Sequence, residues 1–149
     1  MKLRAFAPMV LLLAACGGGS TPPNGPSTSV DPPPTVFGEY DVAVALQQND
    51  CPSSPTVLPQ PTVVHQTPGA GTFNLTHGGL SLAGSVARDG AFTTAPVSVA
   101  DPLGPATLSA AGRFSSTGLE ATVTVAVTGR CRYLVGWSGR NRTKSNVLG

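Results

Sequence analysis

The sequence predicts an all-β fold, a small antiparallel up-and-down barrel of eight short strands. Apolar and polar residues alternate along several short runs, and turn residues separate these runs. No stretch shows the 3.6-residue apolar period of an amphipathic helix. A two-residue period is the pattern of an antiparallel sheet that buries one face and exposes the other. The sequence therefore predicts a sheet whose apolar face is enclosed.

The first strand is expected over residues 39–47, where Tyr40, Val42, Val44 and Leu46 share one face. The clearest alternation is in residues 119–128, with four valine or leucine side chains on one face and threonine or glutamate on the other. Six further strands are expected at 62–66, 72–77, 80–87, 92–99, 107–114 and 131–137. Pro96 interrupts the run at 92–99 and predicts a bulge or a sheet edge there.

Turn signals join these strands into hairpins. Gly78-Gly79 and Asp89-Gly90 separate consecutive runs, and an Asp-Gly pair is among the strongest hairpin signals in a sequence. Residues 115–118 and Thr128-Gly129 connect the last three strands. Successive hairpins form a meander, and pairing the first strand with the last removes both exposed edges. A barrel is therefore preferred, with a two-sheet β-sandwich as the alternative.

Size and strand number make the predicted domain similar in outline to a small lipocalin or avidin barrel. The chain carries the sequence motifs of neither family. The resemblance therefore implies a fold and supplies no binding residues.

The N-terminus has the organisation of a secretory signal. Lys2 and Arg4 precede an apolar run over residues 5–13, which is too short to span a membrane. The following Leu13-Ala14-Ala15-Cys16 resembles the lipobox of bacterial prolipoproteins. This resemblance implies cleavage before Cys16, a lipid on the Cys16 sulfur, and an acyl chain such as palmitate on the new amino group.

The same resemblance implies a location in the cell envelope. Multiple acyl chains would hold the protein firmly at a membrane. Because Gly17 rather than an aspartate follows Cys16, the expected location is the outer membrane in a cell with two membranes. The expected division is a signal peptide at 1–15, a tether at 16–36 and a barrel domain with a basic tail at 37–149. The tether is rich in Gly, Ser, Thr and Pro, a composition that does not form a packed core.

Two cysteines remain after Cys16 is assigned to the lipid. Cys51 follows the first expected strand and Cys131 opens the last, and an even pair in an exported domain indicates a disulfide. Closing a loop of about 80 residues would stabilise the fold by roughly 4–5 kcal/mol. The bond also fits a barrel in which the first and last strands are neighbours.

Charge is unevenly distributed along the chain. Five cations lie in the last 20 residues without an acidic neighbour in that stretch: Arg130, Arg132, Arg140, Arg142 and Lys144. One interpretation is contact with lipid phosphates or an anionic envelope polymer. The other is a solvated tail and one outward-facing strand residue. The chain after residue 15 carries seven basic and seven acidic residues, a balance that disfavours nucleic-acid binding.

Motifs for catalysis are missing. His65 and His77 are isolated, no cluster has the spacing of metal ligands, and no nucleophile elbow or phosphate loop occurs. We therefore expect no catalytic residues, no metal and no cofactor.

Six aromatic residues fall on the faces expected to point inward: Tyr40, Phe73, Phe92, Phe114, Tyr133 and Trp137. They either fill the barrel or line a small apolar ligand pocket at its mouth. The leading hypothesis is a non-enzymatic, membrane-anchored structural or interaction module whose partner is an envelope protein or polymer. A barrel that binds a small apolar ligand is the alternative.

Overall fold

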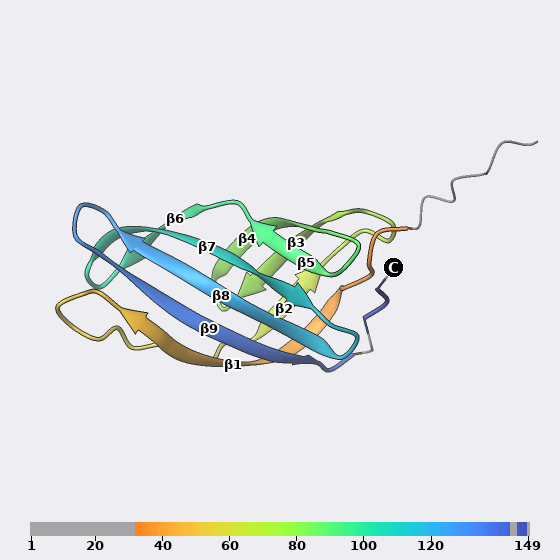
Figure 1. The fold of residues 1–149 in the computed structure, drawn as a ribbon, viewed down its shortest axis with the longest axis horizontal. Helices are drawn as coiled ribbons and strands as arrows, with labels where there is room; N and C mark the ends of the chain where they lie inside the picture. The colour runs from red at the N-terminus through yellow and green to blue at the C-terminus, as the bar shows by residue number, and fades with distance from the viewer. Residues whose placement is uncertain (1–31, 144–145, 149) are drawn as a thin grey trace, which may run out of the picture. The chain divides into compact units, whose positions relative to one another are not determined.

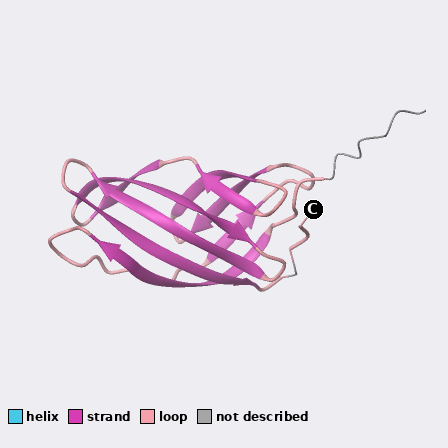
Figure 2. Ribbon diagram, viewed as in Figure 1, coloured by secondary structure: helices cyan, strands magenta, loops and turns pink. Residues whose placement is uncertain are grey.

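The computed structural model describes residues 32–143 and 146–148, which form nine antiparallel strands and no helix (Figure 2). The described residues accordingly contain no helix that could cross a membrane. The strands are β1 (Gly38–Asn49), β2 (Thr62–His65), β3 (Thr72–His77), β4 (Leu80–Val86), β5 (Ala91–Thr94), β6 (Val97–Asp101), β7 (Gly104–Phe114), β8 (Gly118–Val127) and β9 (Cys131–Asn141). The expected all-β class is confirmed.

The sheet closes on itself. Neighbouring strands pair in the order β5-β4-β3-β2-β1-β9-β8-β7-β6, and β5 also pairs with β7. Eight strands thus form a closed barrel, with β6 as an extra strand beside β7. The predicted pairing of the first strand with the last is the β1–β9 ladder, which runs from Tyr40↔Asn141 to Asn49↔Tyr133. The structure is the predicted barrel and not the alternative sandwich.

The extra strand comes from the run interrupted by Pro96. The single strand expected at 92–99 is two strands, β5 and β6, and both pair with β7 at successive positions. Proline has no N–H to donate to a ladder, so the chain leaves the sheet at Ala95-Pro96 and rejoins it at Val97. The bulge or sheet edge predicted at Pro96 is therefore a gap between two separate strands.

The strands differ in length, and this decides where the barrel closes. β1, β7, β8 and β9 have 10–12 residues, whereas β2 to β5 have 4–7. Figure 1 shows the long strands running from end to end of the barrel, with β2 to β5 in the half nearer the C-terminus. Within residues 32–143 and 146–148, β2 pairs only with Gly38 to Tyr40, so the rest of β1 has β9 as its one strand neighbour there.

The apolar side chains of the alternating runs fill the interior of the barrel, as the sequence predicts. In β8, Leu119, Val123, Val125 and Val127 are each at most 3% exposed, while their polar neighbours face outward. Burying each such side chain contributes about 1.5–3 kcal/mol. The first residue of β8 is Gly118, and a Cβ at this position would overlap the carbonyl oxygen of Gly139. A glycine at this position lets β8 and β9 approach each other.

A polar clamp joins the two termini of the barrel. Thr35 and Val147 exchange two backbone hydrogen bonds. Asn146 is 5% exposed, and its side chain donates to the carbonyl oxygens of Ser115 and Gly118. Its Oδ1 lies 2.7 Å from the Tyr40 hydroxyl. This clamp fixes both ends of the domain at one end of the barrel.

The clamp corrects two expected boundaries. Pro34 and Val36 are buried, so they belong to the barrel and not to the tether expected to end at residue 36. The last strand continues to Asn141 rather than ending near Trp137, which places Arg140 in β9 and not in a basic tail. Residues 1–31, including Cys16, lie outside the described residues, as do residues 144, 145 and 149.

The Cys51–Cys131 disulfide is present. The two Cα atoms are 5.0 Å apart and the residues are separated by 80 positions in the sequence. The bond joins the segment after β1 to the first residue of β9, at the end of the barrel opposite the terminal clamp. The predicted pairing is therefore confirmed.

Candidate functional site

A surface depression follows the point where β1 and β2 separate. It is a groove of about 710 Å³ between the start of β1, the end of β9 and the segment that enters β2. Its lining residues are Glu39, Tyr40, Asp41, Val42, Ala43, Pro59, Gln60, Pro61, Thr62, Val63, Ser138, Gly139, Arg140 and Arg142. This volume lies in the range of about 300–1,000 Å³ typical of ligand sites. We call this feature the β1 groove.

One wall of the β1 groove is the proline-rich segment between the first two strands. Residues 52–61 contain prolines at 52, 55, 59 and 61. This segment runs from the disulfide at Cys51 back to Thr62, the first residue of β2. Proline residues cannot donate backbone hydrogen bonds, and among the described residues none in 52–60 forms a backbone hydrogen bond with β1. The wall therefore lies beside β1 without pairing with it.

The groove-facing edge of β1 carries backbone groups without a protein partner. The Glu39 carbonyl accepts a hydrogen bond from the Arg142 N–H on the β9 side, at 2.8 Å. Successive residues of a strand direct their backbone groups to opposite sides, so those of Val42 and Val44 point away from β9. No hydrogen bond to these groups occurs in residues 32–143 and 146–148.

Charges in the β1 groove balance. Arg142 forms an ion pair with Asp41, with Nε 3.3 Å from Oδ2, and both side chains are exposed. Arg140 lies opposite Asp41 in the β1–β9 ladder and makes no ion pair within the described part of the chain. Glu39 lines the same groove. Two acids and two arginines give no net charge, so shape and backbone groups define this site.

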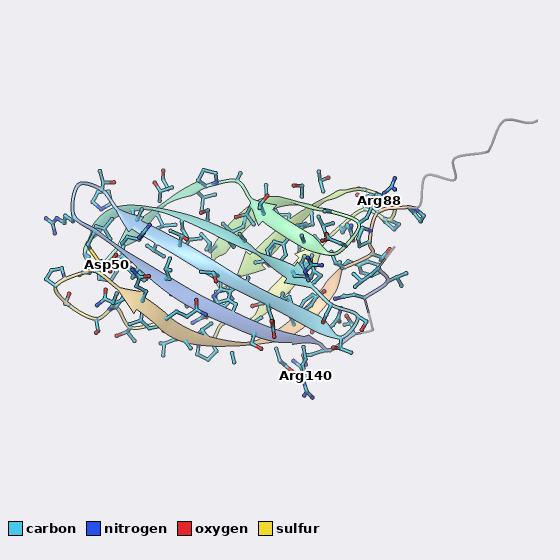
Figure 3. The ribbon with its side chains drawn as sticks, in the orientation of Figure 1. Asp50, Arg88 and Arg140 are labelled. Carbon is cyan, nitrogen blue, oxygen red and sulfur yellow. A yellow bond between two sulfur atoms is a disulfide. The ribbon has the colours of Figure 1, made fainter. Side chains whose placement is uncertain are left out.

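The five cations singled out in the sequence do not form one patch. Arg130 and Arg132 flank Cys131 at the disulfide end, whereas Arg140, the last but one residue of β9, lies about 26 Å from Arg132 at the usual strand rise. In Figure 3, Asp50, which pairs with Arg132 at 3.8 Å, lies at one end of the barrel and Arg140 lies toward the other. Arg130 donates to the Leu103 carbonyl, and Lys144 lies outside the described residues. Contact with an anionic polymer or lipid stays a prediction.

The six aromatic residues of the predicted ligand pocket are all buried, between 0% and 6% exposed. Phe114 contacts Tyr40, Phe73 and Phe92, with ring centroids 4.6–6.0 Å apart. The structure thus brings four of the six together at the clamped end of the barrel. Trp137 and Tyr133 lie apart from this cluster, farther along β9.

The other two aromatic residues have polar neighbours. Trp137 stacks on His77, with centroids 4.3 Å apart, and His77 Nδ1 lies 2.7 Å from the Thr62 hydroxyl. Partial burial lowers the pKa of His77, which favours the neutral ring. The Tyr133 hydroxyl donates to Asp101 at 2.6 Å, and burial together with this carboxylate raises the pKa of Tyr133. Packing of the rings favours the filled interior, and the ligand pocket stays a prediction.

Sequence reasoning missed the β1 groove. It placed Cys51 after the first expected strand and assigned no binding role to the residues between Cys51 and the next strand. A signal was present, because an expected strand of nine alternating residues, 39–47, preceded a proline-rich segment and then an expected strand of only five, 62–66. A short partner cannot cover a long strand, and prolines cannot extend the pairing.

Among the described residues, no group of three or more His, Cys, Asp or Glu side chains could hold one metal ion. No protein-family model matches the chain, and searches of curated proteins and of solved structures find no match. What this site can do is therefore argued from its geometry alone.

Proposed function

We propose that this chain is a lipid-anchored protein of a bacterial envelope, in which a disulfide-closed barrel serves as a non-enzymatic interaction module. The lipobox-like Leu13-Ala14-Ala15-Cys16 implies the anchor, and residues 16–33 connect it to the barrel. The clamp formed by Thr35, Tyr40 and Asn146 carries the proposal, because it fixes the point where the tether enters. The chain thus enters the barrel at the end opposite the Cys51–Cys131 disulfide.

Two further observations support an exported interaction module. The Cys51–Cys131 disulfide is the kind of bond that forms and persists in oxidising compartments outside the cytoplasm. The aromatic rings pack against one another in the core, so surface features such as the β1 groove are the candidates for binding. We propose an envelope protein, not a nucleic acid, as the partner.

Fractionation of bacteria that express the full chain tests the anchor. The parent protein is expected in the membrane fraction, and it should incorporate an alkyne-labelled palmitate. Cys16→Ser removes the only thiol in the lipobox-like motif and should abolish both results. Cys51→Ser is the matched control, because it removes a cysteine without affecting the motif. If Cys16→Ser protein still carries the label and stays in the membrane fraction, the proposal is wrong.

A further inference from the structure

The β1 groove combines features that a binding site for one extended polypeptide strand requires. Its lining includes the small residues Ala43 of β1 and Ser138 and Gly139 of β9, which leave room for the backbone of a ligand. Val42 lines the groove, and Val44 is the next residue of β1 whose backbone groups point to the same side; no described residue pairs with the N–H and C=O groups of either. Backbone groups at two-residue spacing are the chemistry that recognises an extended strand.

The wall of the groove restricts the kind of occupant. Pro59, Gln60 and Pro61 stand across from Val42 and Ala43, so the space beside β1 is bounded on both sides. A second copy would have to bring the edge of a whole barrel, including its own proline-rich wall, into this bounded space. A single extended segment needs only the width of one strand, about 4.8 Å from β1.

The position of β2 shows how such a segment would lie. β2 pairs with β1 at Tyr40↔Thr62 and starts there. An added antiparallel segment would continue the line of β2 along β1 and would bond the N–H and C=O of Val42.

We propose that β1 from Asp41 to Ala45 is the docking edge for an extended segment of a partner polypeptide, which binds as an added strand in the β1 groove. The segment would carry small or β-branched side chains, which suit a half-buried strand. The balanced charges of Glu39, Asp41, Arg140 and Arg142 impose no net charge on it.

The probe is a capped peptide of alternating threonine and valine, about six residues long, the usual length of a strand. It is added to the isotope-labelled full chain in detergent, and exchange of individual amide protons is followed by NMR. Binding should slow the exchange of the Val42 and Val44 amides about tenfold or more. A peptide N-methylated at alternate residues cannot donate along one edge, and it should bind at least about tenfold more weakly.

A pair of variants separates the backbone from the side chain. Val44→Pro removes the groove-facing N–H, and Val44→Ala keeps it while shortening the same side chain. Val44→Pro should bind the peptide about tenfold more weakly than Val44→Ala. Trp137 fluorescence reports whether each variant folds. If Val44→Pro does not fold, the N-methylated peptide on the parent protein decides the question.

Three outcomes would overturn the inference. The first is equal binding of the methylated and unmethylated peptides. The second is equal binding by two folded Val44 variants. The third is protection of the Val42 and Val44 amides before peptide is added, which would assign the edge to a second copy if it depends on concentration, and to this chain itself otherwise. The inference deepens the proposed function, yet peptide binding and the Cys16→Ser experiment can fail independently.

Discussion

Replacing both Cys51 and Cys131 by alanine should lower the free energy of unfolding by about 4–5 kcal/mol. The disulfide closes a loop of 80 residues, and the chain-entropy relation gives about 4.5 kcal/mol at 25 °C for a loop of this length. The native structure should persist, because the Asp50 N–H still donates to the Arg132 carbonyl at 2.9 Å and β1 still pairs with β9. Most of the loss therefore comes from the freer unfolded chain.

Guanidinium unfolding followed by Trp137 fluorescence measures this loss. Trp137 is the only tryptophan in the sequence and is 5% exposed in the fold, so its emission should shift to the red on unfolding. The melting temperature should fall by about 15–20 °C, given about 4 °C per kcal/mol for a domain of this size. The slope of free energy against denaturant should rise, because the unfolded chain without the bond exposes more surface.

The reduced parent protein is the control for this experiment. It should match the double alanine variant, which excludes an effect of the substitutions themselves. A loss below about 1 kcal/mol with an unchanged slope would refute the reasoning. That result would mean that the unfolded chain stays compact around the same two segments without the bond.

Three other predictions concern the clamp and the sheet. Asn146→Ala should cost about 1–3 kcal/mol in the same unfolding assay, because it removes the buried amide that donates to the Ser115 carbonyl and leaves the Gly118 carbonyl with the Ser115 N–H alone; no loss would show that water replaces the amide. Burial raises the pKa of Tyr40 to about 12, so the unfolded tyrosine ionises first and stability should fall from about pH 10 to pH 12. Because the pKa of Tyr133 is raised as well, Tyr40→Phe should remove part of this pH dependence, and Tyr40→Phe combined with Tyr133→Phe should remove the rest. An unchanged dependence in Tyr40→Phe would contradict the assignment to Tyr40. Gly118→Ala should prevent native folding, as judged by near-UV circular dichroism, whereas Gly129→Ala, where a Cβ meets nothing within 4 Å, should cost only about 1 kcal/mol.

Periodicity made much of this fold predictable. The alternation over 119–128 correctly assigned each side chain of β8 to the interior or the surface, because the face of a strand residue depends only on its position in the chain. The Asp89-Gly90 turn was predictable for the same reason, since its left-handed glycine, with φ of 85°, is a local requirement. Cys51 and Cys131 could be paired because they are the two cysteines that remain once Cys16 is assigned to the lipid.

The candidate site was not predictable in this way. The β1 groove exists because β2 stops pairing at Tyr40, and the length of β2 is decided by partners far away in the sequence. The five C-terminal cations are neighbours along the chain, yet β9 is extended and carries Arg132 and Arg140 to different ends of the barrel. Nearness in sequence does not become nearness in space along a strand.

The sequence by itself determined the all-β class, the inward and outward faces of the strands, the hairpins and the disulfide. Each depends on local conformation or on a single complementary pair. Only the tertiary structure decided that the barrel closes at one end, that Pro96 splits one strand into two, and that Asn146 reaches Tyr40 across 106 residues. These features depend on strand lengths and registers, which are set by contacts between distant segments and leave no periodic pattern in the chain.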